Sequence, residues 1–91
     1  MYNALIVENK DDVIVVLEPI KTGDKVAYRV GNKDNEIISL SDVPIYHKIA
    51  TRNIKKGEVI LKYGEKIGIA TQNIELGEHV HVQNLDSERE D

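Results

Sequence analysis

The sequence contains no cysteine, no phenylalanine and no tryptophan among its 91 residues. The lack of cysteine excludes disulfides, thiolate nucleophiles and cysteine-type zinc sites. Residues 1–7 lack the basic flank and long apolar stretch of a signal peptide, and no apolar run approaches the length that spans a membrane. We therefore expect a cytoplasmic protein without a membrane partner.

Positive charge is also scarce. The 12 Lys and Arg residues are outnumbered by 16 Asp and Glu residues, which gives a formal net charge of −4. Because phosphate contacts need clustered Lys and Arg, we expect no nucleic-acid partner. An anionic ligand would depend on local positive charge or on a metal ion.

Val and Ile dominate the hydrophobic residues, which make up 41% of the chain. Branched aliphatic side chains suit pleated, half-buried surfaces, so a mostly-β fold is expected. A single domain of this length buries only roughly 60–65% of the surface that its unfolded chain exposes. A groove shared with a partner is therefore easier to form than a deep active site inside this chain.

Short apolar runs separated by turn residues predict strands along the chain. The expected strands cover residues 4–7, 13–17, 25–30, 36–40, 46–50 and 78–82. The polar run 8–12 is expected to be a hairpin loop, and residues 31–35 are expected to be a turn. A short helix starting at Ser41 stays open. Gly68 within a strand pattern indicates a bulge or a close approach of another backbone segment.

The motif Ile-x-x-Gly followed by an acidic residue occurs three times, beginning at Ile20, Ile54 and Ile74. The last two copies belong to a longer repeat that relates residues 50–60 to residues 70–80. Glycine accepts a positive φ at little steric cost, so each copy predicts a turn that leads into a strand, with its isoleucine buried. The motif describes turn architecture and carries no information about a substrate.

The three histidines bracket the longer repeat. In a strand, the spacing of His79 and His81 places both imidazoles on one face, with Val80 and Val82 on the other. Two such rings could ligate a divalent metal, bind a polyhydroxylated anion, or supply a general acid or base near pH 7. His47 would complete a metal triad if the fold brought it to the pair. The alternative is a solvent-facing strand that happens to contain histidine.

Three further polar residues are candidates for ligand contact. The amide of Asn84 lies close to the histidine pair in sequence, and Lys48 and Arg52 are candidate partners for a carboxylate. Arginine offers a bidentate fork for this purpose. Tyr63, which precedes Gly64, is more typical of packing or of a turn than of a catalytic phenol.

Several of these motifs, in this order and spacing, resemble the SAF domain of the altronate/galactarate dehydratase family. The matching motifs are His47-Lys48-x-Ala50, Ile54-x-x-Gly57, Lys62-Tyr63-Gly64, Ile67-Gly68-x-Ala70 and Ile74-x-x-Gly77-x-His79-Val80-His81-x-x-Asn84-Leu85. The resemblance is close over residues 44–85 and loose over the first 43. It implies a β-clip fold of short, bent strands and long hairpins with little helix. The SAF domain would cover residues 1–85, and residues 86–91 would form a charged C-terminal tail.

The resemblance also implies a role in a metal-dependent hydro-lyase of the altronate dehydratase type. The chain would be the small subunit or N-terminal domain, with the main catalytic domain on a separate large subunit and an anionic sugar acid as substrate. His79, His81 and His47 would be catalytic contacts, whereas Asn84, Lys48 and Arg52 would bind the substrate. The complete enzyme would use Fe²⁺, Mn²⁺ or Mg²⁺, which this chain need not bind alone.

Two alternatives to the dehydratase remain open from the sequence. The chain could be the small subunit of a sulfolactate sulfo-lyase, in which sulfite rather than hydroxide departs. It could also be a non-catalytic SAF module that binds a carbohydrate or a protein.

Overall fold

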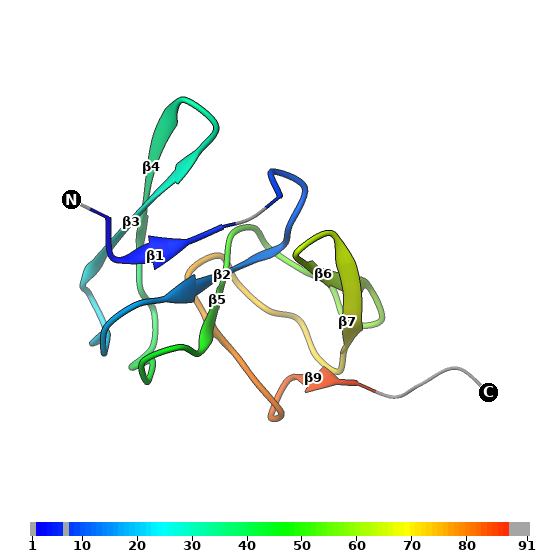
Figure 1. Ribbon diagram of the computed structural model, residues 1–91. Helices are drawn as coiled ribbons and strands as arrows, with labels where there is room; N and C mark the ends of the chain where they lie inside the picture. Colours follow the sequence, from blue (N-terminus) through cyan, green and yellow to red (C-terminus); the bar gives the residue numbers. More distant parts are fainter. Residues whose placement is uncertain (1, 7, 88–91) are drawn as a thin grey trace.

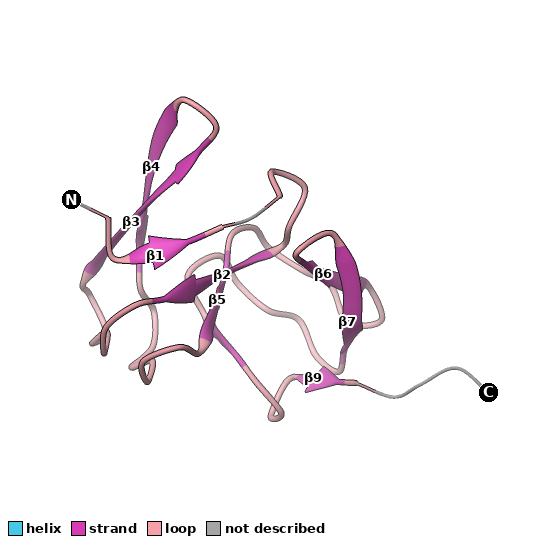
Figure 2. Cartoon of the chain, in the orientation of Figure 1, coloured by secondary structure: helices cyan, strands magenta, loops and turns pink. Residues whose placement is uncertain are grey.

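The computed structural model describes residues 2–6 and 8–87 and shows nine short strands and no helix among them (Figures 1 and 2). The strands form three small antiparallel sheets. The first sheet has the order β1 (Ala4–Leu5), β2 (Val13–Val16), β5 (Lys48–Ala50) and β8 (His79–Val80). The second pairs β3 (Lys25–Val30) with β4 (Lys33–Ile38), and the third has the order β6 (Val59–Lys62), β7 (Glu65–Ala70) and β9 (Leu85–Asp86). The predicted mostly-β domain of hairpins and short strands is confirmed.

None of the described elements is a helix long and apolar enough to cross a membrane. The predicted hairpin at the start of the chain is present, because β1 pairs with β2 in antiparallel register. Its first strand ends at Leu5, and residue 7 lies outside the described residues. At the other end of the chain, Asp86 belongs to β9 and pairs with Ile69 of β7, although the sequence predicts that Asp86 begins the C-terminal tail. The tail beyond residue 87 also lies outside the described residues.

β2 and β5 bury side chains on both of their faces. Ile14 and Ile49 belong to one hydrophobic cluster, which also contains residues of β3 and β4. Val13 and Ala50 belong to a second cluster, which also contains residues of β6, β7 and β8. Successive residues of a strand point to opposite faces, so these two short strands connect both cores.

The Ile-x-x-Gly-acid motif forms a recurrent turn, as predicted. The three glycines share a φ of 93°, namely Gly23, Gly57 and Gly77. The three isoleucines are at most 2% exposed, namely Ile20, Ile54 and Ile74. In each copy the acidic side chain accepts a hydrogen bond from a backbone amide three residues earlier; the pairs are Lys21–Asp24, Lys55–Glu58 and Glu75–Glu78, at 2.8–2.9 Å. The acidic residue therefore closes its own turn.

The structure reveals a fourth copy of this turn, in residues 43–47, that the sequence pattern hides. Val43 is buried and bridges Ile20, as Ile54 bridges Ile74. Tyr46 occupies the glycine position with a φ of 71°. The backbone amide of His47 donates to the carbonyl of Pro44 at 3.1 Å. The backbone amide of the acidic residue makes the equivalent bond in the other three copies. Tyrosine therefore stands in the place of glycine, and histidine in the place of the acid.

Several predicted boundaries are wrong. β4 begins at Lys33, so the turn after β3 has two residues instead of five. The strand expected at 46–50 begins at Lys48, because Tyr46 and His47 belong to the fourth turn. The strand expected at 78–82 has only the two residues of β8. The helix considered at Ser41 is absent from this described part of the chain.

Gly68 lies at a close approach between backbones, as its sequence context predicts. A Cβ atom at this position would lie 2.6 Å from the carbonyl oxygen of Asp86 in β9. The β6–β7 register also shifts between Ile60 and Leu61, and Ile60 pairs with Gly68. A close approach and an adjoining register shift, the two features that glycine in a strand pattern indicates, are therefore both present.

Candidate histidine site

His47, His79 and His81 meet at one end of the first sheet. β5 and β8 pair so that Ile49 lies opposite His79, and the fourth turn places His47 just before β5. Nδ1 of His47 lies 3.0 Å from Nε2 of His79. The rings are stacked, with centroids 4.3 Å apart for His47 and His81, and 5.7 Å apart for His79 and His81. The fold therefore brings the three histidines together.

The rings of His79 and His81 are near parallel, at 8°, but not for the predicted reason. β8 ends at Val80, and His81 begins a turn rather than continuing the strand. Val82 is 78% exposed and does not share the buried face of Val80. The turn, and not strand periodicity, therefore places His81 beside its partners.

Asn84 holds this turn. Its side chain is fully buried: Oδ1 accepts a hydrogen bond from the amide of His81 at 3.0 Å, and Nδ2 donates to the carbonyl of His79 at 2.9 Å. The oxygen and the nitrogen of the side-chain amide thus both bond to the backbone of the two histidines. This geometry supports a positioning role for Asn84 rather than the substrate contact expected from the sequence.

Two residues without a predicted role also contact His79. The hydroxyl of Ser41 accepts a hydrogen bond from its amide at 3.3 Å, and Nε2 of Gln83 donates to its carbonyl at 3.2 Å. Nε2 of Gln83 is also 3.5 Å from Nδ1 of His79. Donation by this amide favours the tautomer in which Nε2 of His79 carries the proton and donates to Nδ1 of His47.

The surroundings of His79 and His81 favour their neutral forms. Burial lowers the pKa of His79, and the charges of His47, His81 and Lys48 lower it further. Desolvation also lowers the pKa of His81, with added contributions from His47 and Lys48. At pH 7 both rings are therefore mainly unprotonated, which is the form that accepts a proton or binds a metal ion.

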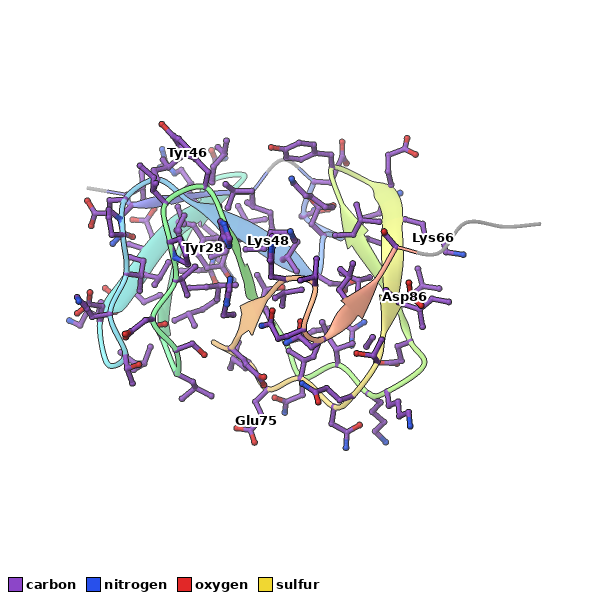
Figure 3. All side chains as sticks on the ribbon, turned by 90° about the horizontal axis from the view of Figure 1, so that it is seen from below. Tyr28, Tyr46, Lys48, Lys66, Glu75 and Asp86 are labelled. Carbon is purple, nitrogen blue, oxygen red and sulfur yellow. The ribbon has the colours of Figure 1, made fainter. Side chains whose placement is uncertain are left out.

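Lys48 supplies local positive charge beside the histidines. Its side chain lies near the centre of the face seen in Figure 3. Burial lowers the pKa of Lys48, and the charge of Lys62 at the end of β6 lowers it further. Nζ of Lys62 lies 4.8 Å from the centroid of the Tyr63 ring. The sequence alone predicts no role at the site for Lys62, because nothing local indicates that β6 ends near β5.

Arg52 is not brought to the histidines. It follows β5 at the end opposite to His47, and its guanidinium pairs with Asp12 at 2.7 Å and Glu58 at 3.2 Å. It also donates to the carbonyl of Asn53 at 2.9 Å. These contacts support a role in stability rather than the predicted substrate contact.

Asp11 and Asp12 are buried, although their sequence context predicts only a polar loop. The carboxylate of Asp11 accepts hydrogen bonds from the amides of Tyr63 at 2.8 Å and Gly64 at 2.7 Å. Asp12 accepts one from the amide of Leu61 at 2.8 Å. The two carboxylates therefore fasten the β6–β7 hairpin to the first sheet, a long-range role that has no local sequence signal.

The histidine donor set fits a divalent transition metal. One ligand nitrogen from each of the three half-buried histidines lies within 4.8 Å of the other two. Imidazole nitrogen suits Fe²⁺ better than Mg²⁺, which prefers oxygen ligands. His47, His79 and His81 are thus the residues of this chain that would hold such an ion.

These features define a small all-strand domain that carries a histidine cluster at a sheet end. The chain belongs to the altronate/galactarate dehydratase SAF domain family, whose sequence profile matches residues 2–88. The resemblance inferred from its motifs is confirmed.

Relatives of two kinds are similar to the chain. The (2R)-sulfolactate sulfo-lyase subunit alpha of Chromohalobacter salexigens is 35% identical over 88 residues, which cover 92% of this chain and 94% of that subunit. Altronate dehydratase of Bacillus subtilis is 38% identical over 79 residues, which cover 86% of this chain. Altronate dehydratase of Escherichia coli is 39% identical over 75 residues. The chain spans only 15% and 14% of these two dehydratases.

Proposed function

We propose that the chain is the small subunit or small domain of a lyase of the altronate dehydratase type, which eliminates water from a sugar acid. The main catalytic domain would lie on a large subunit, by which we mean a chain that resembles the dehydratases beyond the segment matched here. One observation carries the proposal: three histidines from two distant parts of the chain meet in a half-buried cluster. The lyase names of the family relatives support it.

The elimination needs a proton acceptor next to the substrate carboxylate and assistance to the departing hydroxide. His79 and His81, with lowered pKa values, are suited to accept a proton near neutral pH. Lys48 and Lys62 supply positive charge for the carboxylate. Alternatively, the histidines would hold a divalent ion that polarises the substrate oxygens as a Lewis acid, and the proton acceptor would then come from the large subunit. The cluster is only half-buried, so the large subunit would complete the site and exclude water.

Reconstitution tests the proposal. The isolated chain should be inactive, and activity should arise when the large subunit is added, in a screen over hexonates, hexarates and sulfolactate. Replacing His79 and His81 together by Ala should lower turnover at least about 100-fold, as expected for the loss of acid–base groups. Arg52→Ala is the matched control and should retain turnover. Full activity of the isolated chain would refute the division of labour, and full activity of the double variant would refute the role of the cluster.

A second candidate is the small subunit of a sulfolactate sulfo-lyase. A relative supports it, because the chain is 35% identical over 88 residues to the (2R)-sulfolactate sulfo-lyase subunit alpha of C. salexigens. The same groups would serve, with sulfite as the leaving group in place of hydroxide. Release of sulfite from sulfolactate, without turnover of hexonates or hexarates, would decide for this candidate. Binding of a sugar acid without any turnover in the reconstituted complex would instead support a non-catalytic module.

A further inference from the structure

The fourth turn keeps a buried aliphatic residue, Val43, at the isoleucine position but departs from the other three turns at the glycine and acidic positions. In the other copies the side chain of the acidic residue accepts a hydrogen bond within its own turn, as Glu58 does from the amide of Lys55. His47 occupies that position in the fourth copy, and its ring contacts His79 instead. The acidic residue of the recurrent turn is therefore replaced at the histidine cluster. Departures from local sequence preferences are expected at functional sites.

Tyr46 is the second departure. Its φ of 71° lies in the left-handed region, where a side chain costs stability that glycine would not. The side chain is 68% exposed, so its own packing does little to offset that cost. Figure 3 shows Tyr46 projecting from the edge of the molecule. A strained and exposed aromatic residue has no evident use in the isolated chain.

Val82 completes the pattern. Tyr46 and Val82, at 68% and 78%, are the two most exposed of the large hydrophobic residues in the described ranges. Tyr46 immediately precedes His47, and Val82 immediately follows His81. Exposed apolar side chains therefore flank the histidine cluster at both of its chain segments. Their position on both sides of the cluster, rather than their exposure alone, suggests a contact surface, and tyrosine is enriched among the residues that dominate binding energy at interfaces.

We propose that Tyr46 and Val82 are the anchors by which the large subunit docks over the histidine cluster. This inference rests on the proposed function and identifies the surface that it requires. Two facts select this occupant: the sulfo-lyase relatives are named as one subunit of an enzyme, and the dehydratase relatives continue far beyond the matched segment. The partner surface would offer an apolar pocket for the tyrosine ring next to the catalytic residues.

The variant Tyr46→Gly restores the residue used in the other three turns, so it separates folding from docking. We expect it to be at least as thermally stable as the wild-type chain, because the left-handed strain is removed. Its affinity for the purified large subunit, measured by titration calorimetry, should fall about tenfold or more. Val82→Ser should change affinity in the same direction by a smaller factor.

Tyr63→Gly is the matched control, because Tyr63 also has a positive φ, 59°, and is 47% exposed, but lies at the tip of the β6–β7 hairpin. Its affinity should equal that of the wild type. Wild-type affinity for Tyr46→Gly, or an equal loss in both variants, would overturn the docking role. The proposed function would survive that result if turnover still depended on His79 and His81. Failure of the wild-type chain to bind the large subunit would overturn both.

Discussion

Nδ1 of His47 lies 3.0 Å from Nε2 of His79, although 32 positions separate the two residues in the chain. The contact follows from two structural facts: β5 pairs with β8, and a turn of the recurrent type precedes β5. In the other turns the equivalent position holds an acidic residue that closes its own turn. Exchange of that acid for histidine frees the side chain for a long-range contact.

The isolated chain should bind a divalent transition metal through its three histidines. Titration calorimetry with Co²⁺ or Ni²⁺, used as air-stable probes, should show one site per chain. His47→Ala should weaken binding by at least about tenfold, because even residues outside the ligand shell change metal affinity 10–100-fold. Arg52→Ala should leave the affinity unchanged, since Arg52 lies at the opposite end of β5. Equal affinities for the wild type and the His47 variant would contradict metal binding by the cluster.

Asn84 should contribute to stability through its two backbone hydrogen bonds. Asn84→Ala leaves the amide of His81 and the carbonyl of His79 without these partners, so it should lower the free energy of unfolding by about 1–3 kcal/mol. Gln83→Ala removes an exposed contact with the same carbonyl and should cost less than about 0.5 kcal/mol. Urea denaturation measures both values. Similar values for the two variants would show that the buried amide does not hold the turn.

Asp12 and Arg52 should contribute unequally to stability, although they form one ion pair. Asp12→Ala removes the buried acceptor for the amide of Leu61 and should cost about 2–3 kcal/mol. Arg52→Ala should cost about 1 kcal/mol or less, because Arg52 is 44% exposed and its charge pairs are screened by water. The comparison is made by urea denaturation at pH 7. A larger loss for Arg52→Ala would mean that the ion pair, and not the backbone contact, stabilises this region.

Gly57 and Gly77 have the same backbone conformation and different surroundings. A Cβ atom at Gly57 would meet no atom within 4 Å, whereas one at Gly77 would lie 2.5 Å from the carbonyl oxygen of Ile38. Gly57→Ala should therefore cost only the left-handed strain, about 1–2 kcal/mol. Gly77→Ala should cost about 1–3 kcal/mol more, because the backbone must move. Thermal denaturation gives the difference, and equal losses would show that the approach at Gly77 is easily relieved.

Glu58 should contribute to acid sensitivity. The amide of Lys55 and then the guanidinium of Arg52 lower the pKa of Glu58 from its ordinary value of 4.5. A carboxyl whose pKa is lower in the folded state adds stability above pH 4.5 and loses it as pH falls through the folded value. Between about pH 5 and pH 3, Glu58→Gln should show a shallower fall in unfolding free energy than the wild type. Glu36→Gln, on an exposed position of β4, is the control and should follow the wild-type curve.

The parts of the fold that could be predicted from the sequence are those that local chemistry decides. Isoleucine and glycine at fixed spacing specify each recurrent turn, and alternation in β3 places Val26 and Tyr28 on the buried face. Strand ends were less predictable, because the length of a ladder depends on its partner. β8 stops at Val80 because its partner strand β5 begins at Lys48, which lies opposite Val80.

The fourth turn escaped the sequence pattern because tyrosine does not suggest a left-handed residue. Its position emerges only from the bridge between Ile20 and Val43 and from the backbone bonds of Tyr46 and His47. The same holds for Asp11, whose carboxylate reaches the amides of a hairpin more than 50 positions away. Contacts of this range have no local signature, since they depend on which segments the cores bring together.

The sequence by itself determined the mostly-β class and the recurrent turns, and it identified the three histidines as the candidate site residues. Tertiary structure alone decided that these histidines form one cluster, that Lys62 joins Lys48 beside it, and that Arg52 is engaged elsewhere. The physical reason is that turn and strand preferences act over a few residues, whereas a site is assembled by strand pairing and core packing. Here the pairing of β5 with β8 brings His47 to His79.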